Sequence, residues 1–197
     1  EISGEEKMSG EVKFMTQQSL GEYVLSKCIT KYTKLYSSVK VNLLLGNTSL
    51  TKTKLETKEI DFAILLDNVE LKNCESIELG SGDFVLYQKN KSSNNYLFTG
   101  DTPECLYFQN EYKKKYGKTA EITTQIKSWG ILKQLANEGH GAALLPDYLL
   151  KPNEIKFISK ELRLSSYKII AAWPRSKPLN KKSKAFLEIV EKNLAGN

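Results

Sequence analysis

The sequence predicts an α/β fold made of two small lobes joined by two extended crossings. Apolar runs of strand length alternate with helix-like segments along most of the 197 residues, and this alternation is typical of βαβ units. The polar stretch NKSSNN at 90–95 has the composition of a linker. We therefore predict a linker remnant at 1–10, a first lobe made of 11–88 and 169–197, and a second lobe at 89–168.

The clearest βαβ unit lies at 39–66. The run VKVNLLL from Val39 is apolar enough for a strand buried on both faces, and IDFAILL from Ile60 is the second strand. Between them, Gly46-Asn47-Thr48-Ser49 precedes a short helix. This turn is either one wall of a ligand cleft, where free helix-start amides donate to a ligand, or a simple turn with an N-cap. The spacing leaves both interpretations open.

Other segments complete the first lobe. A strand at 11–16 ends at Thr16-Gln17-Gln18-Ser19, and two further strands at 74–79 and 83–88 are predicted to be separated by a tight reversal at Gly80-Ser81-Gly82. The last helix follows Pro178 and Asn180 and is expected to return to this lobe. The helix after the first strand has an inner face made of Leu20, Val24, Cys28, Ile29, Tyr32 and Leu35.

The second lobe has two well-marked helices. One begins with Thr102 as N-cap and Pro103 at the first helical position, and Gly117 ends it. The other is capped by Ser128 and points Ile131, Leu132, Leu135 and Ala136 inward. Strands are predicted at 96–98, 121–126, 142–145, 155–158 and 167–173.

The sequence contains no recognisable catalytic or metal-binding motif. A single histidine, His140, excludes a multi-histidine metal site, and three widely spaced cysteines favour neither zinc nor a disulfide framework. We therefore predict no enzyme activity, no metal and no cofactor. The net charge of +6 does not indicate nucleic-acid binding, because Arg163 and Arg175 are the only arginines and the lysines are scattered among 23 acids.

Two separated segments of the chain resemble the effector-binding domain of LysR-type transcriptional regulators. The first is GEVKFMTQQSLGEYVLSKCITKYTKLYSSVKVNLLLGNTSLTKTKLETKEIDFAIL, and the second is NEGHGAALLPDYLL. The resemblance covers about Glu11 to Leu194 and implies a type 2 periplasmic-binding-protein fold, in which two lobes surround a ligand cleft. It also implies that a helix-turn-helix domain, absent from this chain, precedes Glu1 and provides all DNA binding.

We expect the strand-to-helix turns to converge on a small-molecule effector. Thr48 stands where the LysR family has a ligand-contacting Thr or Ser. The segment YLFTGDTPECLYF departs from the family's common Gly-Ser-Gly-Thr-Arg loop, so an arginine clamp is absent and Asp101 argues against a strictly anionic effector. Trp129 is either a wall of the site or a core anchor, and His140 is either a turn residue or a ring near the cleft. The candidate residues are Thr16, Gln17, Gln18, Ser19, Asn47, Thr48, Ser49, Gly100, Asp101, Thr102, Ser128 and Trp129.

The function expected from the resemblance is effector sensing in a cytoplasmic transcriptional regulator. Such domains pair as homodimers or tetramers, and the candidate faces here are the helices at 19–35 and 128–137. The alternative is a free solute-binding protein of the same fold that serves transport. No apolar run approaches the length of a membrane span, so no membrane partner is expected.

Overall fold

The computed structural model describes residues 8–67, 70–90 and 95–196 and places them in two compact units. Unit 1 comprises Glu1–Ser81 and Lys168–Asn197, and unit 2 comprises Gly82–Tyr167. The chain passes between the units inside two strands, β4 (Cys74–Tyr87) and β9 (Ser166–Pro174). The division therefore lies at 81/82 and 167/168, compared with the predicted lobe limits at 88/89 and 168/169.

Unit 1 contains a mixed sheet whose strands lie close to the predicted positions. The prediction that the strand from Val39 is buried on both faces was wrong, because this strand is at the edge of the sheet and Leu45 is 50% exposed. β1 (Gly10–Thr16) lies between β2 (Val39–Leu45) and β3 (Phe62–Leu66), and β9 is antiparallel to β3. The chain moves from β1 outward to β2 and then back across β1 to β3. Since both crossovers are right-handed by rule, their helices lie on opposite faces of the sheet.

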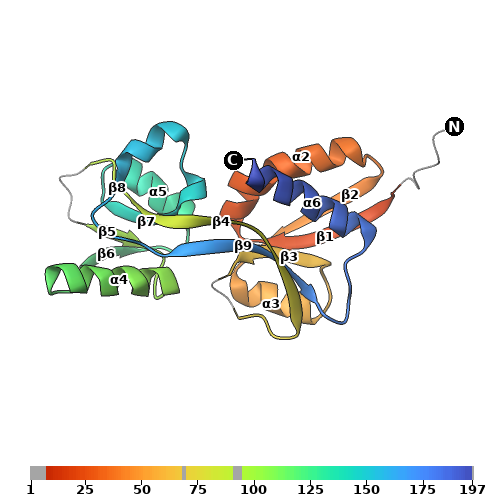
Figure 1. Cartoon of the computed structure of the whole chain (residues 1–197), viewed down its shortest axis with the longest axis horizontal. Helices are drawn as coiled ribbons and strands as arrows, with labels where there is room; N and C mark the ends of the chain where they lie inside the picture. The colour runs from red at the N-terminus through yellow and green to blue at the C-terminus, as the bar shows by residue number, and fades with distance from the viewer. Residues whose placement is uncertain (1–7, 68–69, 91–94, 197) are drawn as a thin grey trace. The chain divides into compact units, whose positions relative to one another are not determined.

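Helices cover both faces of this sheet (Figure 1). α2 (Ser26–Leu35) and α6 (Lys181–Ala195) lie together on one face, and α3 (Thr48–Glu56) lies on the other. The helical segment that leads into α2 starts with a short α1 (Gln18–Leu20) and a π turn, η1 (Gly21–Leu25).

Aromatic rings link these helices to the sheet. The ring of Phe186 on α6 lies 4.6 Å from that of Phe14 on β1, and Phe14 stacks on Phe62 at 4.9 Å. Tyr32 on α2 meets Phe186 edge-on at 5.3 Å. The return of the last helix to the first part of the fold is thus fixed by buried rings, which contribute about 0.5–1.5 kcal/mol per pair beyond their buried area.

One residue predicted on the inner face of α2 is exposed. Leu35 retains 60% of its accessible surface, whereas Cys28 and Tyr32 are buried as predicted. Tyr36, four residues after Tyr32, takes the expected inner position instead, with its ring 4.9 Å from that of Tyr32. The prediction for Leu35 was wrong because a spacing of three and a spacing of four residues both fit a helical face.

The predicted reversal at Gly80-Ser81-Gly82 is also wrong, because β4 runs without a turn through these residues. A Cβ atom at Gly82 would overlap the hydroxyl oxygen of Tyr167 and lie 2.6 Å from an Asp147 carboxylate oxygen. At Gly80, a Cβ would lie 3.1 Å from the side chain of Leu194. These glycines therefore allow close approach of neighbouring side chains to a strand, and they do not form a turn.

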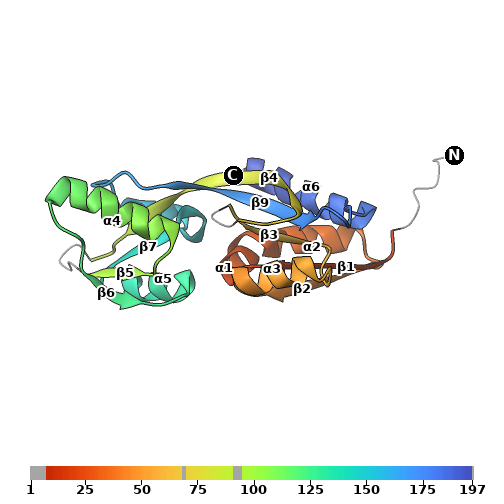
Figure 2. The same cartoon turned by 90° about the horizontal axis from the view of Figure 1, so that it is seen from below.

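Unit 2 has its own sheet. β5 (Tyr96–Phe98) is parallel to both β6 (Ile122–Gln125) and β7 (Ala142–Pro146), and β4 is antiparallel to β7. Figure 2 shows α4 (Pro103–Tyr116) and α5 (Trp129–Asn137) on opposite sides of these strands. α4 begins at Pro103 and ends before Gly117, whose φ is +72°, as its sequence signals predict.

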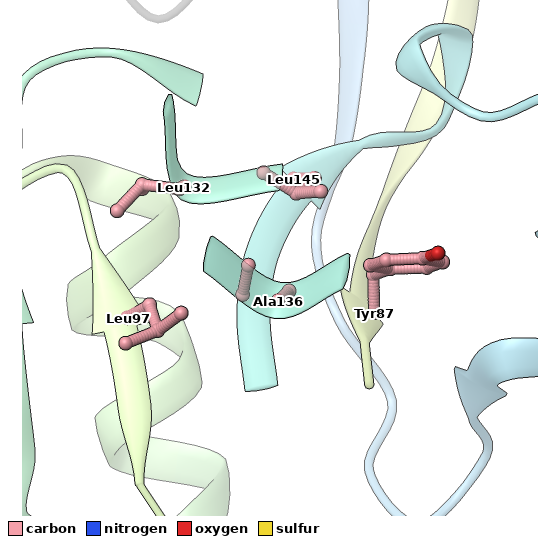
Figure 3. Close-up of a cluster of buried hydrophobic side chains, with 6 residues drawn as sticks. Tyr87, Leu97, Leu132, Ala136 and Leu145 are labelled. Atoms are coloured by element: carbon pink, nitrogen blue, oxygen red, sulfur yellow. The ribbon is translucent and has the colours of Figure 1, made fainter. Parts of the chain in front are cut away.

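The core of unit 2 lies between α5 and the sheet (Figure 3). It contains Leu132 and Ala136, as predicted, but Ile131 is 46% exposed. The predicted strand at 155–158 is instead mostly a 3-10 helix, η3 (Pro152–Phe157). A shorter 3-10 helix, η2 (Asp147–Leu149), precedes it in the sequence, and a two-residue strand, β8 (Ile158–Ser159), follows it. The buried members of this core are Tyr87, Leu97, Leu132, Ala136, Ala143 and Leu145.

Candidate ligand-binding site

Two of the predicted turns meet at the carboxyl edge of the unit 1 sheet. β1 and β2 are parallel and end in register, with Thr16 opposite Leu45. The backbone N–H of Gly46 donates to the carbonyl of Thr16 at 3.1 Å, so the turn after β2 is bonded to the end of β1. Each turn leads directly into a helix, α1 or α3. These two turns therefore lie at the same end of the sheet.

The start of α3 combines a capping residue with unused donors. Asn47 is the N-cap, and its side-chain oxygen accepts from the N–H of Leu50 at 2.9 Å. Thr48 is the first helical residue, and its partly buried hydroxyl has no hydrogen-bond partner among the described residues. The first N–H groups of a helix have no intrahelical acceptor. The hydroxyl of Thr48 and the first amides of α3 are therefore available to a ligand.

Close packing holds these two turns in place. A Cβ at Gly46 would collide with the side chain of Met15, which is buried in β1. At Gly21, in the π turn, a Cβ would lie 3.1 Å from a methyl group of Leu45. Larger residues at either glycine would push the helix starts away from the sheet edge. The π turn is itself a feature that occurs often at functional sites.

The remaining candidates of unit 1 differ in their availability. Thr16 is buried and donates its hydroxyl to the carbonyl of Ile64 at 2.7 Å, so it joins β1 to β3. Gln18 is exposed and donates to Glu22 at 2.8 Å, and Ser19 is buried. The side-chain oxygen of Gln17 is buried and has no hydrogen-bond partner among the described residues. Gln17 thus retains a buried acceptor that no described group uses.

Unit 2 brings together its own pair of predicted turns. Phe98 at the end of β5 lies opposite Gln125 at the end of β6, and the N–H of Ile126 donates to the Phe98 carbonyl at 2.9 Å. The segments 99–102 and 126–128 follow these strands and lead into α4 and α5. Gly100, Asp101, Thr102 and Ser128 thus follow neighbouring strand ends within unit 2.

Gln125 is a residue of this edge that the sequence analysis missed. Gly100 has a φ of +129°, and a Cβ there would lie 2.7 Å from the side-chain nitrogen of Gln125. The hydroxyls of Thr99 and Thr102 are 3.5 Å apart on the same turn. Thr99 follows the apolar strand 96–98, and this position was the signal that could have found it. Gln125 follows Thr123 and Thr124, so no apolar run marks it.

Ser128 and Trp129 have mainly structural contacts. The hydroxyl of Ser128 accepts from the N–H of Ile131 at 3.4 Å and caps α5. The Trp129 ring lies 6.0 Å from that of Phe84 and packs against the unit 2 core, which favours the core-anchor interpretation. Its indole N–H is nevertheless buried without a hydrogen-bond partner among the described residues, so it retains a donor.

Charged side chains of both signs lie near the unit 2 turns. Asp101 is exposed, and Glu104 in the first turn of α4 is 3% exposed. The exposed Lys127 lies between β6 and α5. The exposed ring of His140 lies 3.5 Å from the Glu138 carboxylate. The backbone N–H of His140 donates to the Leu135 carbonyl, so this residue is part of the turn that follows α5. Among the described residues no group of three or more His, Cys, Asp or Glu side chains could hold a metal ion.

Comparison with known proteins finds a family match in the first half of the chain. Residues 5–93 match the LysR substrate binding domain. A transcriptional regulator of the helix-turn-helix type, uncharacterized and encoded in the lacR 5′ region of Staphylococcus xylosus, is 18% identical over 194 residues, which are 95% of this chain and 70% of that protein.

Solved structures of LysR-type regulators have the same fold. HinK of Pseudomonas aeruginosa, a LysR family transcriptional regulator, matches with a TM-score of 0.74 and 16% identity, over 98% of this chain and 72% of HinK. The reduced regulatory domain of OxyR2 from Vibrio vulnificus matches with a TM-score of 0.75 and 17% identity, over 97% and 99% of the two chains.

The solved structures define a type 2 periplasmic-binding-protein fold. Residues 5–93, a little under half of the chain, are similar to the LysR substrate binding domain, in agreement with the resemblance seen in the sequence. The same matches favour regulation over the alternative of a transport protein. No helix in the described part of the chain is long and apolar enough to cross a membrane.

Proposed function

We propose that this domain senses a small polar metabolite and alters transcription through the regulator to which it belongs. The observation that carries the proposal is the hydrogen bond from Gly46 to Thr16, which joins two strand-to-helix turns in unit 1. Free helix-start amides and the hydroxyl of Thr48 then lie at one sheet edge, and such an edge suits an acceptor group on a ligand.

The chemistry of the unit 1 turns supports a ligand with an acceptor group. The amides of α3 and the hydroxyl of Thr48 would donate to a carboxylate or carbonyl oxygen. The unit 2 turns have a different character, since Asp101 and Lys127 carry opposite charges there and the amide of Gln125 and the hydroxyl of Thr102 suit a neutral polar group.

Further parts of the proposal rest on the family. The relatives are named as transcriptional regulators, so we propose that DNA is bound by an N-terminal helix-turn-helix domain of the same regulator, in the cytoplasm. We also propose that two copies of this chain associate through the faces at 19–35 and 128–137. Exposed Tyr23, Leu35 and Ile131 on these segments are apolar surface that such pairing would cover.

The test is a calorimetric screen with small carboxylic acids, amino acids and their amides at millimolar concentration. Once a binder is found, Thr48→Val deletes one hydroxyl and keeps the shape of the side chain. Loss of this hydroxyl leaves a ligand oxygen unpaired and should weaken binding by about 1–3 kcal/mol, or about fivefold to 150-fold. Thr53→Val, an exposed position later in α3, is the matched control and should bind normally. Equal affinity of the wild type and Thr48→Val would contradict the proposed site.

A further inference from the structure

A network of hydrogen-bonded side chains in unit 2 joins the two strands that connect this unit to unit 1. Tyr167 is the last residue of unit 2, and its hydroxyl donates to Asp147 in η2. The other carboxylate oxygen of Asp147 accepts from the backbone N–H of Asp83 on β4 at 3.0 Å. One carboxylate therefore holds both strands where they leave the unit.

Further hydrogen bonds hold β4 next to the start of β9 at the same place in unit 2. The hydroxyl of Ser166 on β9 donates to Asp83 at 2.7 Å, and the N–H of Phe84 donates to the Ser165 carbonyl at 2.9 Å. The Tyr167 ring packs edge-on against Phe84 at 5.3 Å. Burial and the Asp147 carboxylate raise the pKa of Tyr167 well above its ordinary value, so its hydroxyl stays protonated and remains a donor.

The next residue along the chain is held by unit 1. The N–H of Lys168 donates to the Asp67 side chain at 2.9 Å, and the N–H of Asp67 donates to the Lys168 carbonyl at 3.0 Å. The ammonium group of Lys168 also pairs with Glu78 on β4 at 2.7 Å. Consecutive residues, Tyr167 and Lys168, are thus each bound to a different unit.

We propose that Asp147, Tyr167, Asp83 and Ser166 form a strand lock that holds the unit 2 ends of β4 and β9 together and thereby restricts movement between the units. Phe84–Tyr87 on β4 are held by their pairing with β7. Without the lock, the strand residues next to the unit boundary could change conformation, and the units would move more freely. The absence of a side chain at Gly82 is part of the device, because a Cβ there would overlap the Tyr167 hydroxyl. This inference concerns the ligand-free chain and does not depend on the effector proposed above.

The experiment measures residual dipolar couplings of backbone amides in the ligand-free protein. If the lock restricts motion, both units of the wild type share one alignment magnitude. Tyr167→Phe removes the hydroxyl and keeps the ring, and it should give the two units different magnitudes. Gly82→Ala should act in the same direction by displacing the hydroxyl. Ser166→Ala removes the exposed hydrogen bond to Asp83 and should leave the fold intact. It should produce a smaller difference in alignment magnitude than Tyr167→Phe.

Tyr116→Phe is the matched control. It removes another tyrosine hydroxyl of unit 2, which donates to Glu161 at 2.8 Å away from the connecting strands. This variant should keep the common alignment. The proposal is overturned if the wild-type units already align differently, if Tyr167→Phe and Ser166→Ala both leave the common alignment unchanged, or if Tyr116→Phe alters it as much as they do.

Discussion

The side-chain oxygen of Asn47 accepts a hydrogen bond from the backbone N–H of Leu50 at 2.9 Å and thereby caps α3. The next residue, Thr48, is left with a hydroxyl that has no partner among the described residues. From sequence alone, either residue could have been the cap, because both types favour that position. The structure assigns the cap to Asn47, and this separates a residue needed for stability from one available for binding.

Substitutions at these two positions should therefore affect stability differently. Asn47→Ala removes the cap and should lower the free energy of unfolding by about 1 kcal/mol. Thr48→Val should change it by no more than about 0.5 kcal/mol, as is usual for a position without such a feature. Urea melts of the ligand-free variants would measure both effects. A loss in Thr48→Val equal to that in Asn47→Ala would show that Thr48 has a structural role.

Much of the candidate site could be predicted because its positions follow from strand and helix patterns. The apolar run from Val39 and the Gly46-Asn47-Thr48 turn together specify a strand end and a helix start, and parallel strands bring such ends to one edge. Gln125 could not be found in this way, since its proximity to Gly100 depends on the pairing of β5 with β6. The sequence carries no direct record of which strands pair.

The error at Gly80 and Gly82 has a similar cause. Glycine in a sequence indicates either a turn or a place where other atoms come close, and local pattern does not distinguish the two. Here the close atoms belong to Tyr167 and Leu194, which are more than 80 residues away in the sequence. Only tertiary structure could identify them, so β4 was predicted as two strands.

Adjacent positions on α5 test the observed core of unit 2. Leu132 is fully buried in the cluster that includes Leu97 and Leu145, and Ile131 is nearly half exposed. Leu132→Ala should lower the free energy of unfolding by about 2–5 kcal/mol because it leaves a cavity. Ile131→Ala should cost much less, and thermal and urea melts would compare them. Similar losses in both variants would mean that α5 is rotated from the orientation described.

Lys133 and Glu154 form a largely buried ion pair that connects α5 to η3. The ammonium group donates to Glu154 at 2.8 Å and to the Leu149 carbonyl at 2.6 Å. Burial alone would raise the pKa of Glu154. The hydrogen bonds from Lys133 and from the Lys151 backbone, with their positive charges, outweigh burial and hold this pKa below its usual value of 4.5.

Glu154→Gln should therefore be destabilising, and its effect should depend on pH. A carboxylate whose pKa is lower in the folded state stabilises the fold above the unfolded pKa, and this contribution is lost as the pH falls through the folded pKa. At pH 7 the variant should lose about 1–3 kcal/mol, because Lys133 keeps its burial and loses its charged partner. Below about pH 4 the difference from the wild type should shrink. Urea melts at pH 7 and in acid would measure it, and a pH-independent difference would contradict this account.

The isolated chain should not recognise a DNA sequence. It has two arginines, Arg163 and Arg175, and base recognition depends heavily on arginine. Its lysines give at most salt-sensitive, unselective binding. A mobility-shift assay with the promoter region of the parent regulator, against a scrambled duplex of equal length, should show no preference. Nanomolar binding that selects the promoter would refute this expectation.

Association of two copies is the last expectation, and it can be tested at single exposed residues. In a two-fold pairing each contact occurs twice, so one substitution changes the interface at two places. Leu35 at the end of α2 is 60% exposed and lies on a predicted face, whereas the similarly exposed Leu106 lies on α4, outside both faces.

Light scattering at high micromolar concentration should give a dimer mass for the wild type and for Leu106→Glu. Leu35→Glu buries two charges in the interface and should shift the mass toward the monomer. A monomeric wild type would reject the pairing, and a dimer that is broken by Leu106→Glu instead of Leu35→Glu would place the interface on another surface.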